Sequence, residues 1–258
     1  MRALVTGGAR RIGREIALYL ARRGHDVAVQ YATSATEAGE VVAAIRALGR
    51  QGVALQADLL DWDATEALVP AAARALGGPL TVLVNNASIF DYDNIRTATR
   101  ASWERHMGSN LRAPLQLIQG FAAQVPRAVP DADGEPVAQG LVVNMIDQRV
   151  WKLTPEFMTY TLAKSGLWTL TQTAAQALAP DVRVNGIGPG PTMQGARQSA
   201  SHFARQRAAT VLKRGAGAAD VAVALGFFLD SPGVTGQMIA VDGGQHLGWQ
   251  TPDVLGVE

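Results

Sequence analysis

Tyr160 and Lys164, four positions apart, are the pair in this sequence with the clearest capacity for acid–base chemistry. Residues four apart are neighbours on an α-helix, so one helix would hold the phenol beside the ammonium. A nearby positive charge favours the phenolate, which predicts that the pKa of Tyr160 falls from about 10 towards working pH. A general acid is most effective near that pH. For this spacing alone, a solvated helix face stays open as an alternative.

A glycine-rich segment at residues 6–13, TGGARRIG, lies between a short apolar run and an amphipathic one. Glycines between a strand and a helix let the backbone approach a pyrophosphate, and the helix N-terminus supplies N–H donors. A tight strand-to-helix turn without a ligand is the plainer interpretation. We expect a dinucleotide at Gly7, Arg10, Arg11, Ile12 and Gly13.

The elements that position these groups follow from the hydrophobic pattern. Short β-branched runs alternate with helical patterns, which is typical of βαβ units and a parallel sheet covered on both faces. Strands are expected at residues 3–6, 26–31, 53–57, 81–84, 141–145, 183–187 and 238–241. Helices are expected near residues 12–23, 34–48, 63–76, 101–124, 155–179, 197–212 and 218–230.

Two segments carry loop and helix-start signals. Residues 126–140 are rich in Pro, Gly and Asp and are expected to form a surface loop. Thr154 and Pro155 predict a helix start, because a hydroxyl can cap the helix and Pro is favoured at its first position. Tyr160 and Lys164 would then lie in the first turns, near the carboxyl edge of the sheet, where ligands bind in open α/β folds.

Composition excludes several classes of protein. The chain has 258 residues, 48% of them hydrophobic, and no low-complexity linker, so we expect one dinucleotide-binding domain over residues 1–258. It has no cysteine, and its four histidines show no metal-ligand spacing, so no metal is expected. A net charge of +1 gives no electrostatic case for nucleic acid or a membrane surface. With no long apolar run and a strand-like N-terminus, a cytoplasmic protein is predicted.

Four motifs occur in the order seen in short-chain dehydrogenases/reductases: TGGARRIG, NNAS at 85–88, YTLAK at 160–164 and GPGP at 188–191. The sequence resembles this superfamily over nearly its whole length. The resemblance implies a Rossmann-type α/β fold, a doubly wound three-layer sandwich with a seven-stranded parallel sheet. The sixth position of the first motif, usually glycine in the family, is Arg11 here.

The resemblance implies a nicotinamide cofactor, and the residues favour NADP(H). NAD-preferring sites usually carry an acid at the end of the second strand, whereas here none occurs before Glu37. Arg10 and Arg11 can supply cations for a 2′-phosphate, and Thr33 or Ser34 a hydroxyl donor. The other expected cofactor contacts are Tyr31, Asp58, Leu59, Asn86, Ala87, Ser88, Tyr160, Lys164, Pro189 and Gly190.

Asp147 lies thirteen positions before Tyr160, where short-chain reductases usually have Ser. A Ser hydroxyl can donate to a ketone oxygen, but a carboxylate only accepts. Asp147 therefore suits a substrate with N–H groups, or a relay through a protonated carboxyl. A surface Asp that closes a strand is the alternative. Asp, Tyr and Lys at this spacing resemble pteridine reductases and dihydromonapterin or dihydrofolate reductases.

This closer resemblance implies further roles. Phe90 matches the ring that sandwiches a pterin against the nicotinamide, where stacking adds to burial. Ser88 and Arg11 match positions near the substrate and the cofactor phosphates, and Asn110 matches a helix Asn that relays protons through water to the Lys. The pocket is expected to be completed by Arg149, Trp151, Phe157 and residues 191–195. Trp151 could equally pack at a subunit contact.

The leading hypothesis is an NADPH-dependent reductase of a dihydropterin, dihydromonapterin or dihydrofolate. Tyr160 would donate the proton, Asp147 orient the ring or relay a proton, and Lys164 hold the nicotinamide ribose. A general ketone or 3-oxoacyl reductase is the second hypothesis, and a silent NADP-binding regulator on the same fold is the third. The resemblance also implies a homotetramer packed through helices near 101–124 and 155–179, and residues 248–258 could reach a neighbouring subunit.

Overall fold

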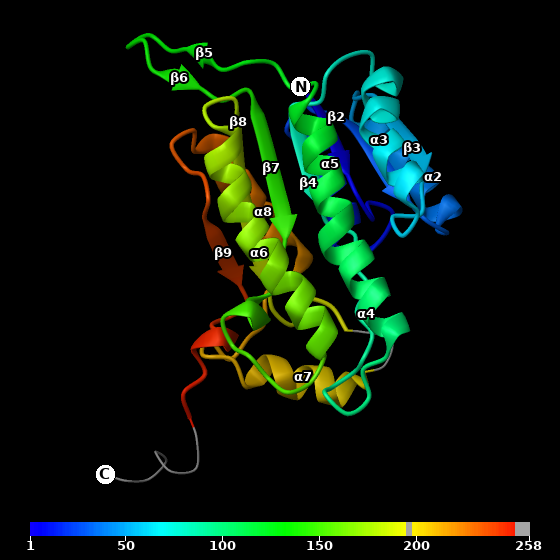
Figure 1. Cartoon of the computed structure of the whole chain (residues 1–258), viewed down its shortest axis with the longest axis vertical. Helices are drawn as coiled ribbons and strands as arrows, with labels where there is room; N and C mark the ends of the chain where they lie inside the picture. Colours follow the sequence, from blue (N-terminus) through cyan, green and yellow to red (C-terminus); the bar gives the residue numbers. More distant parts are fainter. Residues whose placement is uncertain (195–197, 251–258) are drawn as a thin grey trace.

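The computed structural model of the chain describes residues 1–194 and 198–250. Seven parallel strands form one sheet in the order β3-β2-β1-β4-β7-β8-β9 (Figure 1). The strands are β1 (Arg2–Val5), β2 (Asp26–Tyr31), β3 (Gly52–Gln56), β4 (Val82–Asn85), β7 (Gly140–Met145), β8 (Val182–Pro189) and β9 (Met238–Val241). This confirms the predicted Rossmann-type fold, and the strand bounds differ from the prediction by at most two residues at each end.

Helices cover both faces of the sheet. One face carries α1 (Arg11–Arg22), α2 (Ala35–Ala47) and α8 (Ala218–Asp230). The other carries α3 (Trp62–Ala75), α5 (Ala113–Ala122) and α6 (Met158–Leu178), of which α5 and α6 lie in front of the sheet in Figure 1. Helices α4 (Arg100–Met107) and α7 (Ala200–Ala208) lie beyond the carboxyl ends of the strands.

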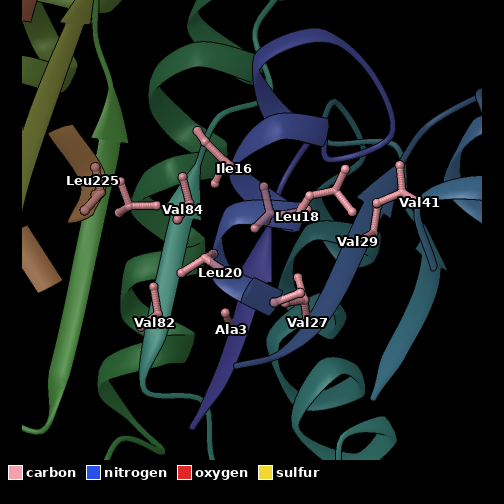
Figure 2. Packing of buried hydrophobic residues seen from close by; sticks show 14 of the residues in the cluster. Ala3, Ile16, Leu18, Leu20, Val27, Val29, Val41, Val82, Val84 and Leu225 are labelled. Carbon is pink, nitrogen blue, oxygen red and sulfur yellow. The ribbon is translucent and has the colours of Figure 1, made fainter. Parts of the chain in front are cut away.

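Side chains of the strands alternate between these two layers. In β1, Ala3 and Val5 join the core under α1, whereas Leu4 joins the core under α5. Figure 2 shows Ile16 and Leu20 of α1 directed at the strands of that first core. A parallel strand buried on both faces must be apolar at every position, so it appears in sequence as a continuous β-branched run. For this reason the strands could be located from the sequence.

The expected helix at 101–124 is divided into three segments. Between α4 and α5 lies a π-helical turn, η1 (Gly108–Arg112), which contains the fully buried Asn110. The Asn110 amide accepts from the backbone N–H of Ile89 at 2.9 Å and donates to its carbonyl at 2.8 Å. Turns of this kind often occur at functional sites. Here the turn attaches the helix to the loop that follows β4.

Helix α6 begins at Met158, so the predicted start at Thr154 and Pro155 was wrong. The carboxylate of Asp93 accepts from the backbone N–H of Thr159 at 3.1 Å, which satisfies a free donor of the first turn. A local sequence signal could not reveal this cap, because Asp93 comes from the loop after β4. Tyr160 still lies in the first turn of the helix, as the spacing required.

The segment expected to be a loop at 126–140 contains a short antiparallel hairpin, β5 (Val129–Pro130) and β6 (Pro136–Val137). Its turn is held by Asp131, whose carboxylate accepts from the backbone N–H groups of Asp133 and Glu135, both at 2.9 Å. Side-chain caps of this kind let Asp stabilise a turn. The hairpin projects from the amino end of the sheet, away from the clefts described below (Figure 1).

Strand β1 pairs with β2 on one side and with β4 on the other. The strands that follow β1 are therefore added first on one side of it and then on the other, although all of them run parallel. The helices that follow β1 and β4 therefore lie on opposite faces of the sheet, an arrangement that leaves a crevice at its carboxyl edge. Among residues 1–194 and 198–250, no helix has the length and apolar character needed to cross a bilayer. The same residues contain no group of three His, Asp or Glu side chains suited to a metal ion.

Candidate active site

A cleft of about 420 Å³ opens beside the glycine-rich loop between β1 and α1. Its lining includes ten residues predicted to contact a cofactor: Gly7, Arg10, Arg11, Ile12, Gly13, Asp58, Leu59, Asn86, Ala87 and Ser88. The sequence did not point to five others: Gln30, Ala32, Leu60, Ile89 and Ser109. Tyr31, Thr33 and Ser34 are not among the lining residues, and their contact with a cofactor stays a prediction.

Two glycines explain why the backbone can turn so tightly here. Gly7 has a φ of +59°, in the left-handed region that favours glycine. A Cβ at Gly13 would lie 2.2 Å from the carbonyl oxygen of Gly7 and 2.5 Å from Nδ2 of Asn86. That Nδ2 donates to the carbonyls of Thr6 at 2.8 Å and Gly7 at 3.2 Å. Asn86 thus joins the loops after β1 and β4, and the cradle suits a pyrophosphate.

Gln30, near the end of β2, is a positioning residue that sequence reasoning missed. Its side chain accepts from the backbone N–H of Gly7 at 2.8 Å and donates to the carbonyl of Ala57 at 2.7 Å. It is buried, and its bond to Ala57 lies out of water, whereas its bond to Gly7 lies at the wall of the cleft. A lone amide in an otherwise apolar buried strand was the available signal, since buried polar groups need partners.

The two adjacent arginines of the loop have different partners. Arg10 forms an ion pair with Glu37, the acid that the sequence places just after the second strand. The guanidinium of Arg11 donates to the carbonyls of Gln194 at 2.9 Å and Met193 at 3.0 Å, beyond the end of β8. Arg11 has a φ of +53°, which a non-glycine residue adopts only when its surroundings hold it there. Arg11 therefore connects the glycine-rich loop to the segment after β8.

A second cleft, of about 910 Å³, adjoins the first, since Arg11 and Ile12 line both. Residues predicted for the substrate or the nicotinamide line it: Phe90, Asp147, Arg149, Phe157, Tyr160, Pro189, Gly190 and Pro191. Of the predicted loop at 191–195, position 195 lies outside the described residues. Trp151 is not among the lining residues, and its ring contacts those of Trp168 and His246 instead.

The three residues of the predicted acid–base group converge beside this cleft. The Tyr160 hydroxyl donates to Oδ2 of Asp147 at 2.8 Å. The other carboxylate oxygen of Asp147 accepts from the backbone N–H of Arg149 at 2.8 Å. Lys164 is buried, and its Nζ donates to the carbonyl of Met145 at 2.7 Å and lies 5.7 Å from the centroid of the Tyr160 ring.

The predicted fall in the pKa of Tyr160 was wrong for this structure. Burial, the negative charge of Asp147 and the hydrogen bond to Asp147 raise the pKa of Tyr160 well above 10.0. Burial raises the pKa of Asp147, which hydrogen bonds and Lys164 only partly offset. Burial also lowers the pKa of Lys164 to about 8, although Asp147 opposes the shift. The sequence showed the cation four residues away, but not the carboxylate at hydrogen-bonding distance.

Two predicted substrate residues, Ser88 and Phe90, come from the loop after β4. A hydrogen bond from Ser88 favours the ionised form of Tyr160 and opposes the rise in its pKa. The ring of Phe90 stacks on that of Phe157, with centroids 4.2 Å apart and planes 8° apart. The rings of Tyr160 and Phe90 meet edge to face, with centroids 4.7 Å apart. These aromatic groups border a site suited to a flat ring.

Asn110 lies near this site but does not line either cleft. Both ends of its amide are taken by the backbone of Ile89. Its side chain therefore holds the start of the loop that carries Phe90, and its predicted part in a proton relay stays a prediction.

The chain is similar in sequence and fold to known reductases. Residues 7–246 match the protein family described as Enoyl-(Acyl carrier protein) reductase. The chain is 43% identical to FolM Alternative dihydrofolate reductase 1 from Brucella suis, crystallised with NADP, over 98% of both chains, with a TM-score of 0.90. The corresponding Brucella canis complex gives 41% identity and a TM-score of 0.89 over 98% of this chain and 97% of that one. A 3-oxoacyl-(acyl-carrier-protein) reductase FabG of Staphylococcus aureus is 32% identical over 95% of this chain and 98% of that protein.

Proposed function

The chain belongs to the short-chain dehydrogenase/reductase superfamily, and we propose that it reduces a pterin-type substrate such as a dihydropterin, dihydromonapterin or dihydrofolate. It is an NADP-dependent oxidoreductase, as its solved relatives with bound NADP indicate. One observation carries the choice of substrate: the group bonded to Tyr160 is the carboxylate of Asp147 rather than a hydroxyl. The ionised carboxyl can accept from the N–H groups of a pterin, and the protonated carboxyl can resupply a proton to Tyr160, whereas a ketone oxygen is served by the hydroxyl donor that this chain lacks at position 147.

The cofactor cradle supports this proposal. Gly7, Gly13 and the N-terminus of α1 would hold the pyrophosphate, and the loop can keep this shape because Gly13 has no Cβ to meet Gly7 and Asn86. Asp58 and Leu59 line the far part of the first cleft, and Pro189 and Gly190 line the second. Lys164 would hold the nicotinamide ribose. When bound, NADPH supplies the hydride.

Tyr160 and Asp147 then act as one proton-donating pair. In the structure, burial and the negative charge of Asp147 keep the proton on the phenol, because both raise the pKa of Tyr160. Burial raises the pKa of Asp147 and so favours its protonated form. Protonation of Asp147 removes the negative charge that opposes ionisation of Tyr160. Tyr160 can then pass its proton to the substrate ring, and Asp147 replaces it across the 2.8 Å hydrogen bond. Ser88 stabilises the transient phenolate.

A second candidate function, reduction of a 3-oxoacyl thioester, is favoured by the 32% identity to FabG. The two candidate functions call for different groups beside Tyr160: a carboxyl for a pterin and a hydroxyl for a 3-oxoacyl thioester. A substrate assay with both classes therefore discriminates between them.

The test follows NADPH oxidation by absorbance with dihydrobiopterin, dihydrofolate and an acetoacetyl thioester in parallel. We expect the wild-type enzyme to reduce a pterin substrate with the highest kcat/KM. The matched variant Asp147→Ser restores the hydroxyl usual in the superfamily, and should lose pterin reduction by about a hundredfold or more. Faster turnover of the thioester by the wild type would overturn the proposal. An equal kcat/KM with NADH would contradict only the preference for NADP and would leave the choice of substrate unaffected.

A further inference from the structure

A chain of buried polar groups lies behind Tyr160 and takes no part in the steps above. It consists of His106 on α4, Thr159 on α6 and Asp93 in the loop after β4, with exposed fractions of 0%, 1% and 1%. Nδ1 of His106 lies 2.6 Å from Oγ1 of Thr159, and that hydroxyl donates to Oδ2 of Asp93. Buried polar groups that are fully bonded to one another hold a single arrangement.

The direction of these hydrogen bonds determines the state of the imidazole. The backbone N–H of Asp91, which can only donate, points to Nε2 of His106 at 3.1 Å. Nε2 must therefore be unprotonated, and Nδ1 carries the proton of a neutral ring. Nδ1 donates to Thr159, whose own hydroxyl proton goes to Asp93. A second proton on His106 would place two donors against each other at Asp91.

The chain connects the two segments that form the proposed site. The carbonyl of Asp93 accepts from the backbone N–H groups of Phe157 at 2.7 Å and Met158 at 3.3 Å, at the start of α6. The N–H held by His106 belongs to Asp91, directly after Phe90. Asp93 thus holds one end of this loop against α6 directly, while His106 holds Asp91, beside Phe90.

We propose that His106 is a positioning residue: its neutral ring holds Phe90 and Asp91 in place beside α6, and its protonation releases this part of the loop and weakens substrate binding. The kinetic consequence rests on the proposed function, whereas the structural consequence does not. The glycine cradle lies outside the network, so NADPH binding stays unchanged.

The charges around His106 agree with a neutral ring at neutral pH. Asp93 and Asp91 face it from the loop, Arg105 lies beside it on α4, and Tyr160 presents its ring from α6 with centroids 5.9 Å apart. Burial, assisted by Arg105, lowers the pKa of His106 below 6.5 despite the two carboxylates. The network is therefore intact at neutral pH and loosens on acidification.

The first test needs no substrate and no variant that must fold. Nitrogen NMR of the histidine rings in the wild-type protein at pH 7 should show His106 as the neutral Nδ1–H tautomer. The Asp91 amide should be protected from hydrogen exchange at pH 7 and lose protection as the ring titrates. An Nε2–H tautomer, or Asp91 protection unaffected by that titration, would overturn the proposal.

The second test uses two amides that each replace one nitrogen of the ring. His106→Gln can still accept from Asp91, whereas His106→Asn can only reach Thr159. We expect the Asn variant to show Asp91 exchange and a KM for dihydropterin both raised about tenfold, with an unchanged Kd for NADPH. The Gln variant should remain close to wild type in both.

The outcomes of these tests are separable from the failure of the proposed function. Equal exchange and equal KM in the two variants would refute the role of His106. Absence of turnover with every pterin would refute the proposed function, while the ring tautomer and Asp91 exchange would still decide the role of His106.

Discussion

At the scale of single residues, the chemistry depends on which group lies next to the Tyr160 hydroxyl. The carboxylate of Asp147 accepts a hydrogen bond from this hydroxyl at 2.8 Å, whereas the ammonium of Lys164 donates to the carbonyl of Met145. Burial and the charge of Asp147 both raise the pKa of Tyr160. A Ser at position 147 would remove that charge, which is why one substitution separates the two candidate substrate classes.

Replacement of Tyr160 by Phe removes the proton donor but keeps the ring that packs against Phe90. We expect kcat for the pterin substrate to fall by about a hundredfold or more, with the Kd for NADPH within about twofold of wild type. Stopped-flow turnover and fluorescence titration of NADPH measure the two quantities. Tyr19→Phe, in the half of α1 that is distant from the glycine-rich loop, is the matched control. A Tyr160→Phe enzyme with normal kcat would exclude Tyr160 as the donor.

At the scale of elements, the site is built where strands end and helices begin. Helix α1 starts directly after the glycine-rich loop, and α6 starts where Asp93 caps it from a distant loop. The π-helical turn between α4 and α5 places Asn110 against Ile89. Each of these contacts orients a helix end or a loop towards the carboxyl edge of the sheet.

Gly13→Ala should damage the cradle, because the added Cβ would meet the Gly7 carbonyl at 2.2 Å. We expect the Kd for NADPH to rise at least about tenfold, since the loop must shift away from the pyrophosphate position. Gly39→Ala in α2 is the matched control, with no atom within 4 Å of its Cβ. It should keep NADPH affinity and gain about 0.5–1 kcal/mol of stability. Equal Kd values in the two variants would show that the cradle does not bind the cofactor.

At the scale of the whole molecule, strand order brings distant segments to one edge. The two clefts meet at Arg11, which bonds to carbonyls more than 180 positions later in the chain. The homotetramer and the cytoplasmic location remain predictions. Residues 251–258, part of the segment expected to reach a neighbouring subunit, lie outside the described residues.

Stability should depend on pH through His25, which is 5% exposed. Burial, together with the charges of the N-terminus, Arg23 and Arg50, lowers the pKa of His25 to about 4, and Asp26 opposes this. Between pH 4 and 6.5 the unfolded chain binds more protons than the folded one, so stability falls as pH falls through this window.

His25→Gln should remove the contribution of His25 to the pH dependence of the free energy of unfolding. Urea unfolding at pH 7 and pH 5 should show a loss of stability smaller by about 2 kcal/mol in the variant than in the wild type. The difference between the two proteins isolates His25 from other titrating groups, including Asp147. An identical loss in both proteins would mean that His25 is not buried in its neutral form.

The sequence by itself determined the sheet and its strands, and it supplied the candidates for the reacting groups. Strands buried on both faces must be apolar throughout, so their pattern is visible without a structure. Two further signals are local, because each depends on positions within one strand–helix unit. They are the spacing of Gly7 and Gly13 and the series Asp147, Tyr160 and Lys164.

Only the tertiary structure decided the distances and the exclusion of water around those groups. The cap of α6 by Asp93 and the Gln30 bond to Gly7 join segments that the sequence places apart. The direction of a pKa shift depends on burial and on the nearest charge, and both arise from packing between elements. For that reason the residues of the site could be named from the sequence, while the protonation of Tyr160 could not.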